Sequence, residues 1–349
     1  MSEAPRACIL SVSGPDLLPG EARFLGSANP WGVILMGRSC VSRAQVRALV
    51  QQIWQALGRA CLVFIDKEGG RVARLRGPEW PKFPAPSIFG EVYGRDTEAG
   101  LEAAYLSHRL MAQELADLSI HADCAPVLDL PVPGAHDVIG DRAFSSETLP
   151  TIALAGAAIQ GLLDGGVAPV IKHLPGHGRA RVDSHLELPR VSAGTNELVA
   201  KDFAPFEALN AAPMAMTAHI AFDNLDPSAP ATLSEKVIGE VIRGRIGFEG
   251  LLMTDDLGMN ALGGSLASRA QRALGAGCDV VLHCAGFTKA PAEILAEMEA
   301  VAEVCPRLEA ESQSRAERAA AYTTRAKPFD SDAGWARLRV LVPDESAMA

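Results

Sequence analysis

The feature that most constrains the fold is a series of eight short, largely apolar runs spread along the chain. They occupy residues 8–13, 32–36, 62–66, 122–128, 168–173, 214–219, 250–255 and 278–283. Their shortness and their flanking Gly and Pro residues favour β-strands over buried helix. Because most of them are apolar throughout rather than alternating, the strands should be buried on both faces, as in parallel sheets covered by helices.

Helical patterns lie between most of these runs. The clearest occupy residues 42–57, 96–118, 149–164, 195–209, 234–246 and 265–276. Alternating strands and helices imply parallel strands joined by right-handed crossovers. Eight strands predict a closed (β/α)8 TIM barrel, of the α/β class, and an open doubly wound sheet is the structural alternative. No GxGxxG motif opens a helix after an early strand, which argues against a dinucleotide-binding version of that alternative.

The chain reads as one catalytic domain rather than two. No Gly/Ser-rich or Pro-rich linker divides it, and the part beyond residue 291 is helical and rich in Ala, Glu and Arg. We expect the barrel domain to cover residues 1–326. Residues 327–349 should form a C-terminal tail packed on the barrel or trailing from it.

Composition and charge exclude several classes of function. With 32 Lys and Arg against 42 Asp and Glu, the formal net charge is −10, which disfavours nucleic acid and anionic membranes as partners. No apolar run approaches the ~18 residues of a membrane-spanning helix. The N-terminus lacks the basic and apolar regions of a signal peptide. Seven scattered cysteines without a CxxC pair indicate reduced thiols, so a cytoplasmic location is expected.

Polar residues collect where the predicted strands end, which is where barrel enzymes place their active sites. Asp66-Lys67-Glu68 follow the third run, Lys172-His173 end the fifth, and Asp255-Asp256 end the seventh. Any single strand-end carboxylate could simply cap the next helix. Structural accidents should be spread over both faces of the barrel, however, so their concentration at one end favours a functional site.

Asp183 and His185 form the sharpest pair in the sequence. They lie two residues apart on a Gly-rich loop, where a carboxylate can fix the tautomer of the imidazole and raise its basicity. That would make His185 a proton donor and acceptor near neutral pH, although a surface histidine on a mobile loop is the alternative. Asp255 is then a candidate nucleophile or charge stabiliser. Hydrogen-bonding groups for a polyhydroxylated substrate would come from Asp66, Arg74, Arg142, Lys172 and His173.

Five segments in order resemble the motifs of glycoside hydrolase family 3, and more narrowly its single-domain bacterial β-N-acetylglucosaminidases. They are Ile65-Asp-Lys-Glu-Gly-Gly-Arg71, Gly140-Asp-Arg-Ala-Phe144, Lys172-His-Leu-Pro-Gly-His-Gly178, Asp183-Ser-His185 and Thr254-Asp-Asp-Leu-Gly-Met259. The resemblance extends from about residue 8 to residue 285. It implies a retaining mechanism in which Asp255 is the nucleophile and His185, held by Asp183, is the general acid and base.

The resemblance also implies the substrate and its contacts. Terminal β-linked N-acetylglucosamine would be released from a small carbohydrate or muropeptide in cytoplasmic recycling of the cell wall, without cofactor or metal. A monomer is the expected oligomeric state. The positions that match sugar contacts are Asp66, Arg74, Arg142, Lys172 and His173, with His219 and Met259 as further pocket residues.

Two positions depart from the usual family pattern. Lys67 stands where Gln is usual and would add a charge to the site if it points inward, and Leu174 stands where Phe is usual. The segment 174–189 carries the acid–base pair and several glycines, so we predict that it moves to close over the sugar and exclude water.

Other functions remain open at this level. A metal-dependent hydrolase could use as zinc ligands His173, His177, Asp183, His185, His219 and Asp255. Loss of activity with a chelator and recovery with zinc would favour it. A sugar-binding barrel without turnover, a family 3 β-glucosidase and a glycoside phosphorylase are further alternatives. Phosphorolysis is conceivable because a histidine acid–base group would not repel phosphate as a carboxylate would.

Overall fold

The computed structural model describes residues 3–288, 290–324 and 326–342, and these form a closed barrel of eight parallel strands. Around the barrel the strands neighbour one another in the order β1-β12-β11-β9-β7-β6-β3-β2. The predicted (β/α)8 TIM barrel is therefore confirmed. Its strands are β1 (Arg6–Ser11), β2 (Pro30–Ile34), β3 (Leu62–Ile65), β6 (Ala122–Asp123), β7 (Ala168–Leu174), β9 (Met214–Thr217), β11 (Leu251–Asp256) and β12 (Val280–His283).

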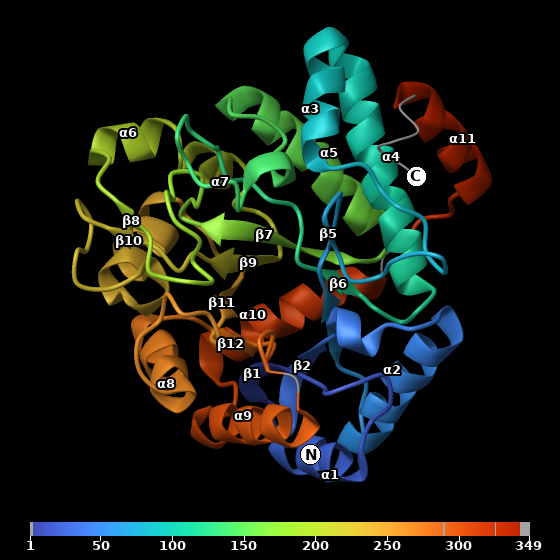
Figure 1. Cartoon of the computed structure of the whole chain (residues 1–349), viewed down its shortest axis with the longest axis vertical. Coiled ribbons are helices and arrows are strands. Elements are labelled where there is room, and N and C mark those ends of the chain that lie inside the picture. Colours follow the sequence, from blue (N-terminus) through green and yellow to red (C-terminus); the bar gives the residue numbers. More distant parts are fainter. Residues whose placement is uncertain (1–2, 289, 325, 343–349) are drawn as a thin grey trace.

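Helices surround the barrel (Figure 1). They are α1 (Pro19–Ala28), α2 (Arg43–Leu57), α3 (Pro86–Arg95), α4 (Thr97–Ala116), α5 (Thr148–Asp164), α6 (Thr195–Ala200), α7 (Ala204–Ala208), the π-helical segment η4 (Val237–Arg245), α8 (Leu266–Ala276), α9 (Pro291–Val304), α10 (Ala310–Ala320) and α11 (Ser331–Leu341). Short 3₁₀ turns are η1 (Gly37–Ser39), η2 (Gly140–Arg142), η3 (Ala231–Leu233) and η5 (Ala321–Thr324). Two small sheets pair β4 (Lys67–Gly69) with β5 (Val72–Ala73) and β8 (Arg190–Val191) with β10 (Ala221–Phe222).

Three of the predicted helices start where the sequence supplies a capping side chain. Ser42, Asp96 and Ser265 each accept a hydrogen bond from the backbone N–H three residues ahead, which satisfies a free donor in the first turn of α2, α4 and α8. Gly58 and Gly277 follow the last residues of α2 and α8 with φ values of 67° and 113°. These left-handed conformations are accessible to glycine and end the helices.

The predicted helix over residues 195–209 is in fact two short helices, α6 and α7. Lys201 leaves the helical conformation after α6, and Pro205 lies in the first turn of α7. Proline has no N–H to donate, so it is tolerated in a first turn but interrupts a helix interior. The sequence analysis also placed no helix at α1 or α3.

The barrel interior explains why the polar residues at the strand ends meet. Inward-pointing side chains alternate along each strand, and those of the lower layers pack in one apolar cluster that includes Phe64, Val170 and Met253. The next inward positions, two residues further on, are Asp66, Lys172 and Asp255. All three line the same cavity at the C-terminal end of the barrel.

The opposite end of the barrel is covered by α10. Leu308, Ala316 and Ala319 belong to the same apolar cluster as the barrel interior. The Ser312 hydroxyl and the Arg315 guanidinium donate to Asp279 Oδ1, directly before β12, at distances of 2.7 and 3.1 Å. The part of the chain beyond residue 291 therefore includes the floor of the barrel as well as an outer layer.

The C-terminal segment that the sequence analysis treated as a tail contains α11, which lies beside α4 (Figure 1). The Arg337 side chain pairs with Glu102 of α4 at 2.6 Å. Residues 343–349 of that segment lie outside the described residues. None of the described helices combines the length and apolar character needed to cross a membrane. All seven cysteines are free thiols.

Candidate active site

A cavity of about 510 Å³ opens at the C-terminal ends of the barrel strands, within the size range of small-molecule sites. Its lining combines residues from five of the strand ends with the loops that follow them. The predicted site residues found there are Asp66, Arg74, Arg142, Lys172, His173, Asp183, His185, Asp255 and Met259. The structure thus brings together nine of the ten predicted side chains, and the exception is His219.

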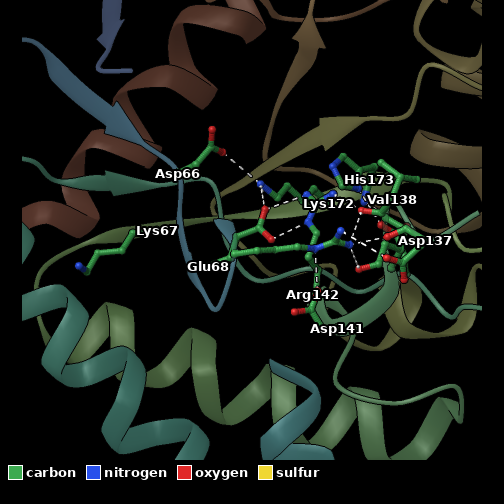
Figure 2. A network of polar contacts seen from close by, with 12 residues as sticks. Asp66, Lys67, Glu68, Asp137, Val138, Asp141, Arg142, Lys172 and His173 are labelled. Carbon is green, nitrogen blue, oxygen red and sulfur yellow. Dashed lines mark hydrogen bonds and ion pairs between the residues drawn. The ribbon is translucent and has the colours of Figure 1, made fainter. Parts of the chain in front are cut away.

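A buried network of ion pairs forms one wall of this cavity (Figure 2). Lys172 lies at its centre, with its Nζ 3.2 Å from Asp66 Oδ1 and 2.5 Å from Glu68 Oε1. Arg142 holds Glu68 through two parallel hydrogen bonds of 2.8 Å, and Arg74 Nη2 donates to Asp66 at 2.7 Å. Bidentate contacts of this kind fix a carboxylate in both position and orientation.

The network keeps its groups ionised despite their burial. Burial raises the pKa of Glu68, but the charges of Arg142 and Lys172 outweigh it and bring the pKa to about 2. Asp66 behaves likewise: burial opposes ionisation, and Lys172 and Arg74 hold its pKa well below the usual range. Burial would lower the pKa of Lys172, yet its two carboxylate partners raise it. The wall therefore presents fixed charges at neutral pH.

Lys67 does not add a charge to this wall. Figure 2 shows its side chain directed away from Asp66 and Glu68. Its Nζ lies 3.1 Å from Glu114 Oε2 on α4 and 4.8 Å from the centre of the Phe83 ring. Adjacent residues of a strand point to opposite faces, so Glu68 faces the cavity and Lys67 faces the helices. The departure from the family pattern at Lys67 is thus accommodated outside the active site.

His173 is oriented by an aspartate that the sequence analysis did not select. Its Nδ1 lies 2.7 Å from Asp129 Oδ2, and Asp129 Oδ1 accepts the His177 backbone N–H at 2.6 Å. With Nδ1 engaged, Nε2 is the ring nitrogen of His173 left to contact a ligand in the cavity. His177 Nε2 lies 3.1 Å from Ser184 Oγ, which ties this buried cluster to the loop that carries Asp183 and His185.

Asp255 is the penultimate residue of β11 and lines the cavity. One carboxylate oxygen accepts the Asp256 backbone N–H at 2.7 Å. Burial pushes the pKa of Asp255 upward, but the nearby His219 and His173 rings, this N–H and Lys172 lower it overall. Asp255 is therefore a carboxylate at neutral pH, as a nucleophile or charge stabiliser requires.

Asp256, the next residue, fastens the end of the strand. Its Oδ1 lies 3.0 Å from His283 Nδ1, and the opposite ring nitrogen of His283 lies 2.9 Å from Glu297 Oε2 on α9. Burial would lower the pKa of His283, but the hydrogen bonds to both carboxylates raise it to about 9. The ring is thus a cation that clamps β11 to α9.

His219, which we expected on the pocket wall, lies beneath it instead. The ring is fully buried, and both nitrogens have protein partners: Thr232 Oγ1 at 2.7 Å and the Asp256 carbonyl at 3.0 Å. It does not line the cavity. The position of His219 after a strand correctly predicted the end of the barrel where it lies. Its side chain, however, holds the backbone beside Asp255 rather than contacting the cavity. Met259, the other position of this kind, does line the cavity.

Asp183 and His185 form a dyad on the loop between β7 and β8. Asp183 Oδ1 accepts the His185 backbone N–H at 2.9 Å and lies 2.7 Å from His185 Nδ1. Burial raises the pKa of Asp183, but these two hydrogen bonds lower it overall. The His185 side chain is 47% exposed, in contrast to the buried wall. Its Nε2 is the nitrogen left to exchange a proton with a ligand.

Sequence reasoning placed Glu68 at a strand end without giving it a role, and it missed Asp129 and Phe287 of this region. Glu68 belongs to a quoted motif, and Asp129 directly follows an apolar run, so the strand-end rule could have assigned both to the site. Phe287 carried no such signal. Among the described residues, no group of three or more His, Cys, Asp or Glu side chains has the arrangement of a metal site. His173 and His185 each have an aspartate partner instead.

The cavity thus brings together an ionised carboxylate, a His–Asp dyad and a wall of fixed charges. Residues 22–322 match the Glycosyl hydrolase family 3 N terminal domain. The chain therefore belongs to glycoside hydrolase family 3, and the predictions of that family and of a glycoside hydrolase are confirmed.

Relatives and solved structures agree with this assignment. A beta-hexosaminidase of Alkalilimnicola ehrlichii is 42% identical over 283 residues, covering 79% of this chain and 80% of that protein. A beta-hexosaminidase of Tolumonas auensis is 40% identical over 281 residues, with 79% and 82% coverage. The crystal structure of NagZ from Neisseria gonorrhoeae in complex with N-trifluoroacetyl-D-glucosamine superimposes with a TM-score of 0.84 at 28% identity, covering 97% of this chain and 98% of that one.

Proposed function

We propose that this enzyme is a retaining exo-β-N-acetylglucosaminidase that releases terminal, non-reducing β-linked N-acetylglucosamine. The observation that carries the proposal is the shared cavity, in which the ionised Asp255 and the Asp183–His185 dyad line one space beside the ion-paired wall. A carboxylate for the anomeric carbon and an imidazole for the glycosidic oxygen are the two groups that a double displacement needs.

In the first step, an Asp255 oxygen attacks the anomeric carbon and forms a glycosyl ester. The bond from that carbon to the glycosidic oxygen breaks, and its electron pair leaves with the oxygen. His185 Nε2–H gives this oxygen a proton, so the aglycone departs as an alcohol. Asp183, bonded to Nδ1, holds the ring with Nε2 toward the cavity and stabilises the charge on a protonated ring.

In the second step, water replaces the ester. His185 Nε2 removes a proton from the water as its oxygen bonds to the anomeric carbon, and the bond to Asp255 breaks. The products are the free sugar with retained β configuration and the regenerated carboxylate. A histidine in this role departs from the usual pair of carboxylates in retaining glycosidases.

The wall would hold the sugar itself. Asp66, Lys172 and His173 present acceptors and donors to hydroxyl groups, and their ion pairs fix them before the substrate arrives. Arg74 and Arg142 reinforce this wall, and Met259 supplies an apolar contact at the edge. Pre-fixed polar groups are worth more than mobile ones because they lose little freedom on binding.

Peptidoglycan fragments in the cytoplasm, in which N-acetylglucosamine is linked to anhydro-N-acetylmuramoyl peptides, are the proposed physiological substrates. The names of the relatives and the N-trifluoroacetyl-D-glucosamine bound to the Neisseria enzyme support the acetamido sugar. The segment 174–189 is proposed to close over it. Amide hydrogen exchange that is equal in this segment with and without N-acetylglucosamine would contradict that movement.

The test compares release of nitrophenol from the β-N-acetylglucosaminide and the β-glucoside in the presence of EDTA. We expect strong preference for the acetamido sugar and no effect of the chelator. Preference for the glucoside would keep the mechanism but replace the substrate, and loss with EDTA that zinc restores would favour a metalloenzyme. Formation of sugar 1-phosphate in phosphate buffer would identify a phosphorylase instead, and binding without turnover would leave only a sugar-binding barrel.

A further inference from the structure

Phe287 is an exposed aromatic side chain at the mouth of the active-site cavity. It is 55% exposed, lines the cavity, and has its ring centre 6.0 Å from that of His185 at an interplanar angle of 73°. Because the ring lines the cavity beside His185, it is placed to contact a ligand bound there. The mechanism proposed above gives this ring no task.

The segment that carries Phe287 is fixed on both sides of the ring. Arg38 Nη2 donates to the Cys284 carbonyl at 2.7 Å, and Nη1 donates to the Ala285 carbonyl at 3.1 Å. On the other side, the Thr288 hydroxyl donates to Glu297 Oε1 at 2.5 Å. An exposed ring on a fastened segment is a pre-formed contact surface rather than the tip of a free loop.

The same anchors reach the catalytic strand. Asp256 Oδ1 accepts the Cys284 backbone N–H at 3.0 Å and contacts His283, whose other ring nitrogen contacts Glu297. Because Asp256 follows Asp255 directly, the segment of Phe287 and the candidate nucleophile share one rigid support. The position of the ring relative to the anomeric carbon is therefore set by the fold.

The identity of the ligand follows from the position of the proton donor. His185 must lie beside the glycosidic oxygen, so whatever is attached to that oxygen on the departing side passes close to its neighbour Phe287. The apolar C–H face of a pyranose ring packs well against an aromatic side chain, which buries apolar surface on both. We propose that Phe287 forms a subsite for the leaving group and selects aglycones with a sugar ring at that position.

This inference rests on the proposed glycosidase activity, and its test separates the two. The substrates are N,N′-diacetylchitobiose, whose leaving group is a sugar, and methyl β-N-acetylglucosaminide, whose leaving group has no ring. Both leave as alcohols that need a proton from His185, so a general defect in the acid would slow both. In Phe287→Leu we expect kcat/KM to fall about tenfold for the disaccharide, and to change less than about twofold for the methyl glycoside.

Two further variants serve as controls. Phe287→Trp keeps an aromatic face and should retain most of the activity on the disaccharide. Leu186→Ala removes a side chain next to His185 that is 71% exposed but does not line the cavity, and it should leave the preference between the substrates unchanged. Equal losses on both substrates in Phe287→Leu, or no loss on either, would overturn the leaving-group subsite. A wild-type enzyme that cleaves neither substrate would remove the proposed function and this inference with it.

Discussion

The two chemical parts of the active site are built in opposite ways. On the barrel wall, the side chains of Glu68 and Lys172 are 1% and 3% exposed and each contacts at least two charged partners. On the loop between β7 and β8, His185 is 47% exposed, and its imidazole has Asp183 as its charged partner. The proposed sugar-binding side is thus fixed by the core, whereas the proposed proton donor lies on an exposed part of a loop.

The difference teaches how binding and turnover can be separated in one cavity. A buried charge network cannot rearrange cheaply, because removing one partner leaves an uncompensated charge. Exposed loop residues can rearrange at less cost than buried ones, so we propose that substrate entry and product release depend on the exposed part of this loop around His185. Asp255 belongs to the rigid part, since it lies near the end of a barrel strand and is held by the backbone of Asp256.

The largest effect is expected from Asp255→Ala. Without the carboxylate no glycosyl ester can form, so kcat should fall by about 10⁴-fold or more. The barrel should persist, because the side chain faces the cavity rather than the core. Activity assays paired with thermal unfolding check this, and turnover close to that of the wild type would refute the nucleophile assignment.

His185→Ala removes the proposed proton donor from the exposed loop. Leaving groups that are poor acids should react about 10²–10⁴-fold more slowly, while activated nitrophenyl glycosides should be affected far less. The free energy of unfolding should hardly change because the ring is half exposed. Kinetics over a series of aryl glycosides of graded leaving-group pKa provide the measurement. If all of them lose the same factor, His185 is not the acid.

Lys172→Met tests the rigid part, with Lys67→Met as its matched control. Both lysines are buried and paired with carboxylates, but only Lys172 faces the cavity. Lys172→Met leaves two buried carboxylates short of a partner, and we expect about 3–5 kcal/mol less stability together with weaker sugar binding.

Lys67→Met should also lower the stability, by about 1–3 kcal/mol. The loss should be smaller than in Lys172→Met because Glu114 keeps its contact with Arg43 at 3.2 Å. Its kcat and KM should stay within about twofold of the wild type. Urea unfolding and steady-state kinetics on both variants make the comparison. A catalytic defect in Lys67→Met would mean that the hairpin β4–β5 transmits changes between its two faces.

The last comparison concerns the effect of pH on stability. Burial lowers the pKa of His177 to about 4, and paired charges bring that of Glu68 to about 2, whereas in an unfolded chain they titrate near ~6.5 and ~4.3. Both pKa shifts favour the folded state at a pH above the pKa values of the unfolded chain. The free energy of unfolding should therefore fall by roughly 3 kcal/mol as the pH drops from 7 to 4. The pKa of His283 is shifted in the opposite direction, to about 9. The charged ring therefore stabilises the fold fully below pH ~6.5, and this stabilisation is lost as the pH rises through 9.

Urea unfolding at pH 4, 7 and 9.5 measures both limbs. In His283→Gln the alkaline decline should flatten while the acid limb stays. An unchanged alkaline limb in that variant would show that the clamp between β11 and α9 is not charged.

The sequence predicted the barrel and most of the cavity because strand period and strand ends are local properties. Alternation along each run places Asp66, Lys172 and Asp255 on the inner face, and parallel strands bring their ends together. What local pattern does not reveal is the partner of a side chain. His219 looked like a pocket residue, yet its ring contacts Thr232 from a 3₁₀ turn that no sequence pattern indicated.

Asp129 and Phe287 are the converse case: the structure places them in the site, but the sequence pattern did not single them out. Asp129 gains its role from His173 and His177, which lie 44 and 48 residues further on, so only the folded chain shows that it orients them. Phe287 is defined by its exposure next to His185, and exposure is a property of the surrounding loops. The split of the expected helix at 195–209 was in principle visible from Pro205.

The helix α10 beneath the barrel has a consequence for biosynthesis. The first strand, at Ala7, bonds to Pro306, and the apolar lower layer of the barrel is closed by Leu308 and α10. During translation the barrel strands are all made before this cover emerges, so a nascent chain that ends short of residue 310 exposes an open apolar end. Truncations at that point should therefore yield insoluble protein, although every residue proposed to act in catalysis is already present.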